Sequence, residues 1–298
     1  MSTVRSERSD EASSSIPRGR RLPWQLHMMR LGLSFLGSFT PGVAGNMALR
    51  IFLTPRRGPL AQREQQVLED ASVLEFSHRA LQLRGYSWGE GPAVLFVHGW
   101  EGRASDLGAF VVPLVDKGYR VVSFDGPAHG NSPGKQTHLV DFGQAIRTVI
   151  ERTKPVHGII GHSFGAASTV VALAEDPKPA VRKVVLVASP SNLGDVVDRF
   201  TAQLGLPDGV FQVLHEGVRT RLGKPVEFFS VPAMAPSLEM PALVVHDEKD
   251  RQIPFSDAQD IVSEWPRASL MATGGLGHNR ILRDPHVVEA IITFLSSE

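Results

Sequence analysis

The most informative absence in this sequence is cysteine. The 298 residues include no Cys, which excludes disulfide bonds, thiolate metal sites and a cysteine nucleophile. Neither sign of charge is in excess, because 31 Lys and Arg balance 31 Asp and Glu, so nothing in the composition favours nucleic acid as a partner. Long hydrophobic runs are also missing: no stretch of about 18 uncharged apolar residues occurs, and a membrane-spanning helix is not expected. The hydrophobic share, 42%, is typical of a globular protein with a sizeable core.

The N-terminal part of the chain divides into two segments of different composition. Residues 1–22 are rich in Ser, Arg and Glu and poor in large apolar groups, which predicts a disordered tail. Residues 23–58 follow as a helical segment, with an apolar run at Leu31–Phe39 and a break at Thr40–Gly42. The pattern is compatible with a helical hairpin packed on the domain, with an interfacial membrane helix making peripheral contact through residues 26–53, and with a cleaved signal sequence. We expect the hairpin and a cytoplasmic protein; the other two would place the protein at a membrane or outside the cell.

From residue 59 to 298 the sequence predicts one α/β domain. Two alternating segments, 72–78 and 80–88, are expected to form neighbouring strands. Beyond residue 92, buried strands alternate with helices, which favours a mostly parallel sheet with helices on both faces. The alternation is interrupted at about 190–240, where helical stretches at 192–205 and 208–222 predict a small helical lid. The other expected strands are 93–97, 119–124, 156–161, 181–189, 242–246 and 268–272, and the other expected helices are 60–71, 103–117, 137–152 and 285–296.

One five-residue motif points to the chemistry. Gly161-His162-Ser163-Phe164-Gly165 lies between an expected strand and an expected helix, so the Ser163 hydroxyl would project from a sharp turn at a helix N-terminus. The same pattern occurs at 130–134, around Ser132. There the next residue is Pro133, which has no N–H to donate to a reaction intermediate. We therefore predict Ser163, and not Ser132, as the nucleophile.

A serine hydroxyl attacks efficiently only when a base takes its proton and a carboxylate orients that base. Asp250 follows the expected strand 242–246 by four residues, and His278 follows the last expected strand. On a parallel sheet both would lie at the same edge as Ser163, and their order along the chain suits a hydrolase with its serine on such a turn. Asp247, nearer to its strand, is a rival carboxylate.

An attacked carbonyl oxygen needs two backbone N–H donors aimed at one point, an oxyanion hole. Phe164, directly after the serine, would provide one of them. Trp100, in the loop His98–Arg103 after the first buried strand, would provide the second. Glu101 lies in the same loop and would place a negative charge near that oxygen unless it points away or pairs with Arg103.

Taken in order, these segments resemble the α/β-hydrolase superfamily over roughly residues 72–298. His98-Gly99 resembles the family's oxyanion loop, Gly161–Gly165 its nucleophile elbow, Asp250 its acid turn and Gly277-His278 its base. The resemblance implies an α/β-hydrolase fold. It also implies a serine hydrolase that cleaves a carboxylic ester in a small-molecule acyl substrate. No cofactor is implied, and the His residues show no spacing that suggests a metal site.

Other functions remain compatible with the sequence. The same three residues would serve an acyltransferase or a carbon–carbon hydrolase. A retained fold without turnover would be a ligand-binding or membrane-peripheral module. Serine at position 163 argues against dehalogenase and epoxide-hydrolase chemistry, for which the resemblance would require a carboxylate there. The oligomeric state and the acyl and alcohol groups of the substrate are not predicted.

Overall fold

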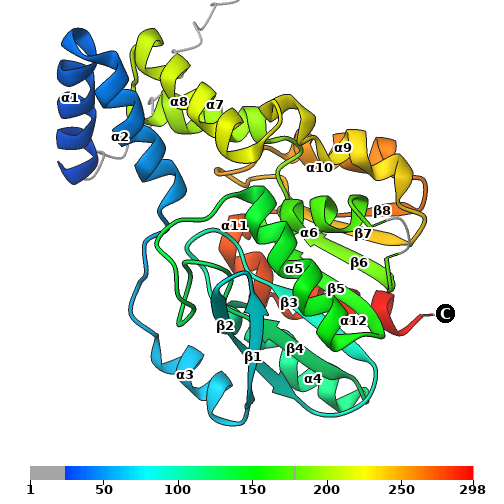
Figure 1. Ribbon diagram of the computed structural model, residues 1–298. Coiled ribbons are helices and arrows are strands. Elements are labelled where there is room, and N and C mark those ends of the chain that lie inside the picture. Colours follow the sequence, from blue (N-terminus) through cyan, green and yellow to red (C-terminus); the bar gives the residue numbers. More distant parts are fainter. Residues whose placement is uncertain (1–23, 177–178, 298) are drawn as a thin grey trace, which may run out of the picture.

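The computed structural model of the protein describes residues 24–176 and 179–297, and a mixed sheet of eight strands forms its centre. The strand order is β1-β2-β4-β3-β5-β6-β7-β8 (Figure 1). β2 runs antiparallel to β1 and β4, and every other neighbouring pair is parallel. The predicted mostly parallel α/β architecture is therefore confirmed. The strands are β1 Ser72–His78, β2 Leu81–Trp88, β3 Ala93–Val97, β4 Arg120–Phe124, β5 Val156–His162, β6 Val181–Val187, β7 Ala242–Asp247 and β8 Ala268–Thr273.

Helices cover both faces of the sheet because its central strands are apolar throughout. All five residues of β3 are buried, as expected for a strand with neighbours on both sides and helices on both faces. Phe142 and Ile146 belong to the core on one face, whereas Leu114 and Ile291 belong to the core on the other. The helices of the first face are α5 Leu139–Thr153, α6 Phe164–Ala174 and α10 Phe255–Glu264, and those of the second are α3 Gln62–Glu69, α4 Val111–Asp116 and α12 Pro285–Ser296.

The segment 103–117 differs from the single helix that the sequence predicts. A 3-10 helix spans Ala104–Phe110, with non-helical backbone at Leu107, and α4 follows it. Pro113 explains the difference, because proline has no N–H and fits only the first turn of an α-helix. A regular helix can therefore begin only just before Pro113. The other predicted strands and helices end within a residue or two of the observed bounds.

The segment between β6 and β7 is a helical insert. Local signals set its helices: the Asn192 side chain accepts a hydrogen bond from the amide of Asp195 at the start of α7, and Gly205 and Gly223 end α7 and α8 with φ of 61° and 73°. α9 packs on α6, so the insert touches the helix that begins next to Ser163. The insert contains α7 Leu193–Leu204, α8 Asp208–Leu222, α9 Val231–Met234 and two 3-10 helices, Val226–Phe228 and Ala235–Ser237.

An N-terminal helical hairpin packs on this insert (Figure 1). Its helices are α1, Trp24–Phe39, and α2, Pro41–Leu53. α2 crosses α8 closely, and each helix has a glycine at the crossing. A Cβ added at Gly45 would lie 2.4 Å from the Cβ of Val213, and one added at Gly217 would lie 2.5 Å from Leu49 Cδ2. The hairpin and the insert therefore share a tight helix–helix interface.

Two expectations about the N-terminal part concern membranes and disorder. Of the helices that the structure describes, none is long and apolar enough to cross a membrane. The predicted tail, residues 1–22, lies outside the described residues.

Candidate active site

Ser163 occupies a sharp turn between β5 and α6. Its backbone has φ 51° and ψ −121°, a conformation that a residue with a side chain adopts only when its surroundings enforce it. The two glycines of the motif permit the close packing around it. A Cβ at Gly161 would lie 2.7 Å from the Cα of Ala166, and one at Gly165 would lie 2.2 Å from the carbonyl oxygen of His98. The sequence motif thus has a steric reason at each glycine.

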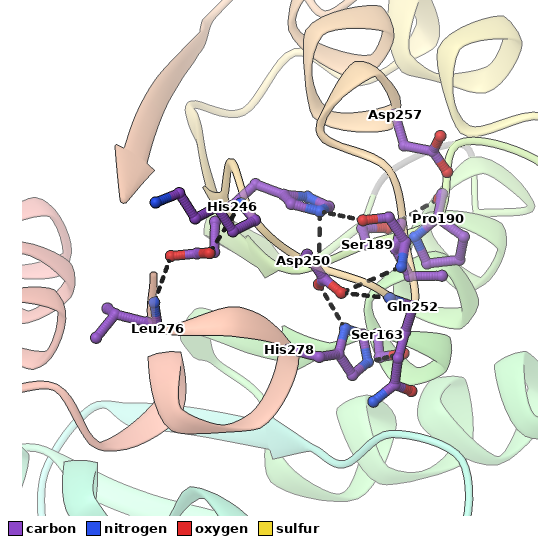
Figure 2. A network of polar contacts seen from close by, with 12 residues as sticks. Ser163, Ser189, Pro190, His246, Asp250, Gln252, Asp257, Leu276 and His278 are labelled. Atoms are coloured by element: carbon purple, nitrogen blue, oxygen red, sulfur yellow. Dashed lines mark hydrogen bonds and ion pairs between the residues drawn. The ribbon is translucent and has the colours of Figure 1, made fainter. Parts of the chain in front are cut away.

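The structure brings Ser163, His278 and Asp250 into one chain of hydrogen bonds (Figure 2). The Ser163 hydroxyl oxygen lies 3.0 Å from Nε2 of His278, and Nδ1 of His278 lies 2.7 Å from Oδ2 of Asp250. Because a carboxylate can only accept, Nδ1 carries the proton and Nε2 is left to accept from the hydroxyl. The Asp250 side chain is fully buried and that of His278 is 8% exposed, so little water reaches the inner hydrogen bond.

Donors on both of its oxygens hold Asp250 as a carboxylate. Burial alone would raise the pKa of Asp250, but hydrogen bonds from His278 and from the amides of Gln252 and Ile253 bring this pKa below its ordinary value. The two amides lie 2.8 and 3.2 Å from Oδ1, which turns Oδ2 toward His278. The buried ring of His246 also lies beside Oδ2, at 3.7 Å (Figure 2). Its Nε2–H donates to the Ile253 carbonyl at 3.1 Å.

Asp247, the rival carboxylate, fastens the loop between β8 and α11, Gly277–Arg280, the short helix that carries His278. Asp247 is buried and accepts hydrogen bonds from the Thr273 hydroxyl and from the amides of Gly275 and Leu276 at 2.8, 3.2 and 2.8 Å. Burial works against its charge, but these donors bring the pKa of Asp247 below its ordinary value. The carboxylate that faces His278 is therefore Asp250, and Asp247 acts on the loop after β8.

A second histidine supports His278, a contact that the sequence does not predict. Nε2–H of His162 donates to the backbone carbonyl of His278 at 3.0 Å, and the two ring centroids are 4.9 Å apart. Burial above all, together with the nearby His278, lowers the pKa of His162 to about 3, so its ring is neutral at pH 7. The only signal in the sequence is that His162 directly precedes Ser163.

The loop after β3 lies directly against Ser163. A Cβ at Gly99 would come within 3.3 Å of the Cβ of Ser163, so a glycine permits this approach. His98 fixes the shape of the loop: Nδ1–H donates to the Gly99 carbonyl at 2.7 Å, and Nε2 accepts from the amide of Gly126 at 2.9 Å. Burial lowers the pKa of His98 to about 4, which preserves this neutral tautomer at pH 7.

The two residues predicted to donate backbone N–H groups, Trp100 and Phe164, lie side by side. Their ring centroids are 5.1 Å apart in an edge-to-face contact. The amide of Ser163 itself is not available, because it donates to the Val187 carbonyl at 2.9 Å. Phe164 is the first residue of α6, and the first amides of a helix have no acceptor within it. Its N–H is therefore free to bind an oxygen from outside the helix.

Glu101 pairs with Arg56, and not with Arg103, which is one of the two possibilities that the sequence leaves open. Its carboxylate accepts two hydrogen bonds from the Arg56 guanidinium, both at 2.8 Å. Burial would raise the pKa of Glu101, but the bonds from Arg56 bring this pKa below its ordinary value. Arg103 donates instead to the carbonyl of Gly58. The sequence cannot reveal the pair, because Arg56 lies in the linker between α2 and α3, whose path has no local signal.

Ser132, the serine of the second Gly-x-Ser-x-Gly match, is buried. Its hydroxyl donates to the carbonyl of Asp125 and accepts from the amide of Arg84 at 2.8 Å. The hydroxyl thus joins backbone segments of β2 and of the loop after β4.

Within the described residues, no group of three or more His, Asp or Glu side chains is placed to hold a metal ion.

Comparison with known families decides the class of the protein. A family model described as the alpha/beta hydrolase family matches residues 94–291. The chain belongs to this family. The matched span contains Ser163, Asp250 and His278, and it begins within β3, immediately before the loop that approaches Ser163.

Individual relatives of this hydrolase are distant. A non-heme chloroperoxidase from Streptomyces lividans is 26% identical over 260 residues, which cover 70% of this chain and 94% of the relative. A bifunctional esterase/perhydrolase from Acinetobacter calcoaceticus is 30% identical over 134 residues, and this match spans about half of that relative, 47%, and 43% of this chain. An esterase from Exiguobacterium antarcticum has the same fold, with a TM-score of 0.60, 17% identity, and coverage of 76% of this chain and 100% of the other.

Proposed function

We propose that this α/β hydrolase cleaves carboxylic esters in small-molecule acyl substrates through an acyl-enzyme formed on Ser163. The observation that carries the proposal is the continuous chain of hydrogen bonds from the Ser163 hydroxyl through His278 to the buried carboxylate of Asp250. Such a chain supplies both the base that removes the hydroxyl proton and the counter-charge for that base. An esterase activity named for one relative and one structural neighbour supports the same chemistry.

The reaction would proceed in two rounds. In the first, the Ser163 oxygen bonds to the ester carbonyl carbon while its proton moves to Nε2 of His278, and the ionised Asp250 stabilises the resulting imidazolium. The bond to the alcohol oxygen then breaks, and the leaving alcohol takes the proton from Nε2. In the second round, water gives a proton to His278 and attacks the acyl carbon. Ser163 recovers its proton and the acid is released.

The amides of Phe164 and Trp100 would stabilise the negative oxygen of each tetrahedral intermediate. The amide of Ser163 is already bonded within the sheet, which leaves Phe164 as the donor from this turn. Pairing with Arg56 offsets the charge of Glu101, so the carboxylate beside Trp100 does not oppose the developing negative charge with its full strength.

The insert at about 190–240 would serve as the lid of the site. The two strands that flank it both end at the site: β6 ends in Val187, which holds the amide of Ser163, and β7 ends in Asp247, which fastens the loop of His278. Closure by the insert would exclude water from the acyl group. We divide the chain into a helical segment, residues 23–58, and the hydrolase domain, residues 59–298, which contains this lid.

Labelling with a fluorophosphonate probe tests the proposal. We expect one modified residue, Ser163, identified by mass mapping, and loss of the label in Ser163→Ala. Ser168→Ala is a matched control, because Ser168 lies on the same helix and its buried hydroxyl has no hydrogen-bond partner in the described structure. The label should persist in this control. Label on another residue, or unchanged labelling of Ser163→Ala, would contradict the proposal.

Aryl esters of graded acyl length would then define the substrate. We expect release of both the aryl alcohol and the acid, with an initial burst of the alcohol for those esters whose acyl-enzyme forms faster than water hydrolyses it. Preferential transfer of the acyl group to an added alcohol would identify an acyltransferase instead. A folded protein that neither takes the label nor releases the alcohol would leave the ligand-binding module as its function.

A further inference from the structure

The outer face of the N-terminal hairpin is the most apolar exposed surface of the described chain. Seven of the twelve exposed large hydrophobic side chains in the described residues lie on α1 and α2. Trp24, Phe35 and Phe39 are each 72% exposed. Spacing of three or four residues along α1 places its members on one side of the helix. This outer face consists of Trp24, Met28, Leu31, Phe35 and Phe39 of α1 and of Val43 and Met47 of α2.

The opposite face of the hairpin packs on the helical insert. Leu33 of α1 is buried, and Ala44 and Ala48 of α2 pack with Val210 of α8. Phe52 makes an edge-to-face ring contact with Phe200 of α7, at 5.0 Å between centroids. These contacts already pack the hairpin on the insert through its inner face. The outer face is therefore exposed in the folded protein. An exposed apolar area of this kind marks an interaction site.

The charge of the same segment is strongly one-sided. The whole chain has 31 basic and 31 acidic residues, yet no Asp or Glu occurs between Glu11 and Glu64. Within that interval all formal charges are arginines, at positions 18, 20, 21, 30, 50, 56, 57 and 63. Arg56 pairs with Glu101 and Arg63 with Glu64, whereas Arg30, Arg50 and Arg57 have no ion-pair partner among the described residues and give the hairpin and its end a positive charge. Such a segment attracts a negatively charged surface.

A basic groove lies at the C-terminal end of α2. It has a volume of about 420 Å³ and is lined by α2 and the loop around residue 135. Arg50 and Lys135 reach this groove, and neither side chain has a hydrogen-bond or ion-pair partner among the described residues. Arg57, also in its wall, is occupied by carbonyls of the loop, including those of Ala128 and Ser132. Two cations without a partner in the described structure, at the C-terminal end of α2, suit a phosphate group.

We infer that the outer face of the hairpin docks on an anionic phospholipid surface. The aromatic and aliphatic side chains enter the boundary between headgroups and acyl chains, and the arginines bind the headgroups. The helices lie in the plane of the surface and do not span it, because α1 has 16 residues and a helix of that length reaches only about 24 Å of a core about 30 Å thick. This inference goes beyond the proposed ester hydrolysis and does not depend on it.

Other occupants fit the charge less well. A second copy of the chain, related by twofold symmetry, would bring two arginine-rich segments together, and like charges across an interface disfavour association. The preceding residues 1–22 carry further arginines and few large apolar side chains. A membrane rich in anionic lipid supplies both the opposite charge and the apolar interior.

Vesicle flotation of the full chain carrying Ser163→Ala tests the inference separately from catalysis. We expect binding to phosphatidylcholine vesicles that contain phosphatidylglycerol, at least about tenfold weaker binding to phosphatidylcholine alone, and weaker binding as salt rises. The double variant Phe35→Ser/Phe39→Ser should bind at least about tenfold less, because two large aromatic side chains no longer enter the bilayer. Val73→Ser/Val112→Ser is the matched control, since both valines are exposed, at 51% and 66%, outside the hairpin.

Two further readouts distinguish the outcomes. Lipids brominated in their acyl chains should quench the fluorescence of Trp24, measured as the part of the signal lost in Trp24→Ser. No binding to anionic vesicles, or equal binding of the hairpin double variant and the control, would overturn the inference. Light scattering that shows a dimer abolished by Phe35→Ser/Phe39→Ser, without vesicle binding, would assign the outer face to a second copy instead.

Discussion

Three buried histidines should make the folded state sensitive to mild acid. Burial, the largest influence on each, lowers the pKa of His98, His129 and His162 to about 4, 3 and 3, compared with an ordinary value of 6.5. The geometry agrees with neutral rings: Nε2 of His98 accepts from the amide of Gly126, and Nε2 of His129 is buried without a partner in the described structure. A folded pKa below the unfolded one means that the stabilisation is complete above about pH 6.5 and is lost as pH falls toward the folded values.

The expected size follows from the pKa differences. Once an unfolded histidine is mostly protonated, each such ring costs about 1.4 kcal/mol of unfolding free energy per unit fall in pH. Between about pH 6 and pH 5 the three rings together should remove about 3–4 kcal/mol. Burial raises the pKa of Asp125 and Asp257, and these carboxyls act in the opposite sense because the folded state takes up their protons first. A single-residue variant compared with the wild type therefore isolates one ring.

His129→Gln is the most selective change. Nδ1–H of His129 donates to the Pro127 carbonyl at 2.9 Å, and a glutamine amide can donate there without titrating. Urea unfolding followed by circular dichroism at about pH 7, 6 and 5 gives the free energies. We expect the loss between about pH 6 and 5 to be smaller in His129→Gln by about 1 kcal/mol. His286→Gln, an exposed control, should follow the wild type. Parallel losses in His129→Gln and the wild type would refute a neutral buried ring at position 129.

Three further predictions concern the site and the hairpin. Asp250→Asn should lower kcat by roughly 10³–10⁴-fold with unchanged circular dichroism, because an amide favours the wrong tautomer of His278; an ester assay with near wild-type kcat would contradict the role of Asp250. Asp247→Asn should lower the free energy of unfolding by about 1–3 kcal/mol, since an amide group would face buried N–H donors; urea midpoints equal to wild type would argue against its hold on the loop. Gly45→Val should lower the free energy of unfolding by about 1–3 kcal/mol through overpacking. Gly32→Ala, where a Cβ meets nothing within 4 Å, should leave it unchanged or raise it by up to about 1 kcal/mol. Equal thermal midpoints of the two variants would refute the tight interface.

The sheet could be predicted because its strands carry their own signals. Ala93–Val97 is apolar at every position, and every position is buried, so the sequence pattern and its physical cause coincide. The places of Ser163, Asp250 and His278 after expected strands predict the three residues of the hydrogen-bonded chain. The carboxyl ends of neighbouring parallel strands meet at one edge of a sheet, and the distances that separate Ser163, His278 and Asp250 along the chain therefore matter little.

Contacts made by linkers and by side-chain choice could not be predicted in this way. Glu101 has Arg103 in its own loop, but it pairs with Arg56. The path of the linker after α2 brings Arg56 to it. The support that His162 gives to the backbone of His278 depends on the loop after β8 folding back over β5. Neither the linker nor that loop has a periodic pattern, so many arrangements would satisfy the same sequence.

The glycine contacts between the hairpin and the insert limit how this protein can be rebuilt. Gly45 of α2 accepts Val213 of α8, and Gly217 of α8 accepts Leu49 of α2, so each helix supplies both a gap and the side chain that fills it. Grafting the hairpin alone onto another hydrolase would leave those side chains facing an unmatched helix. The two segments, separated in the chain by most of the sheet, are therefore a single transferable unit, and an engineer who exchanges one of them must exchange the other.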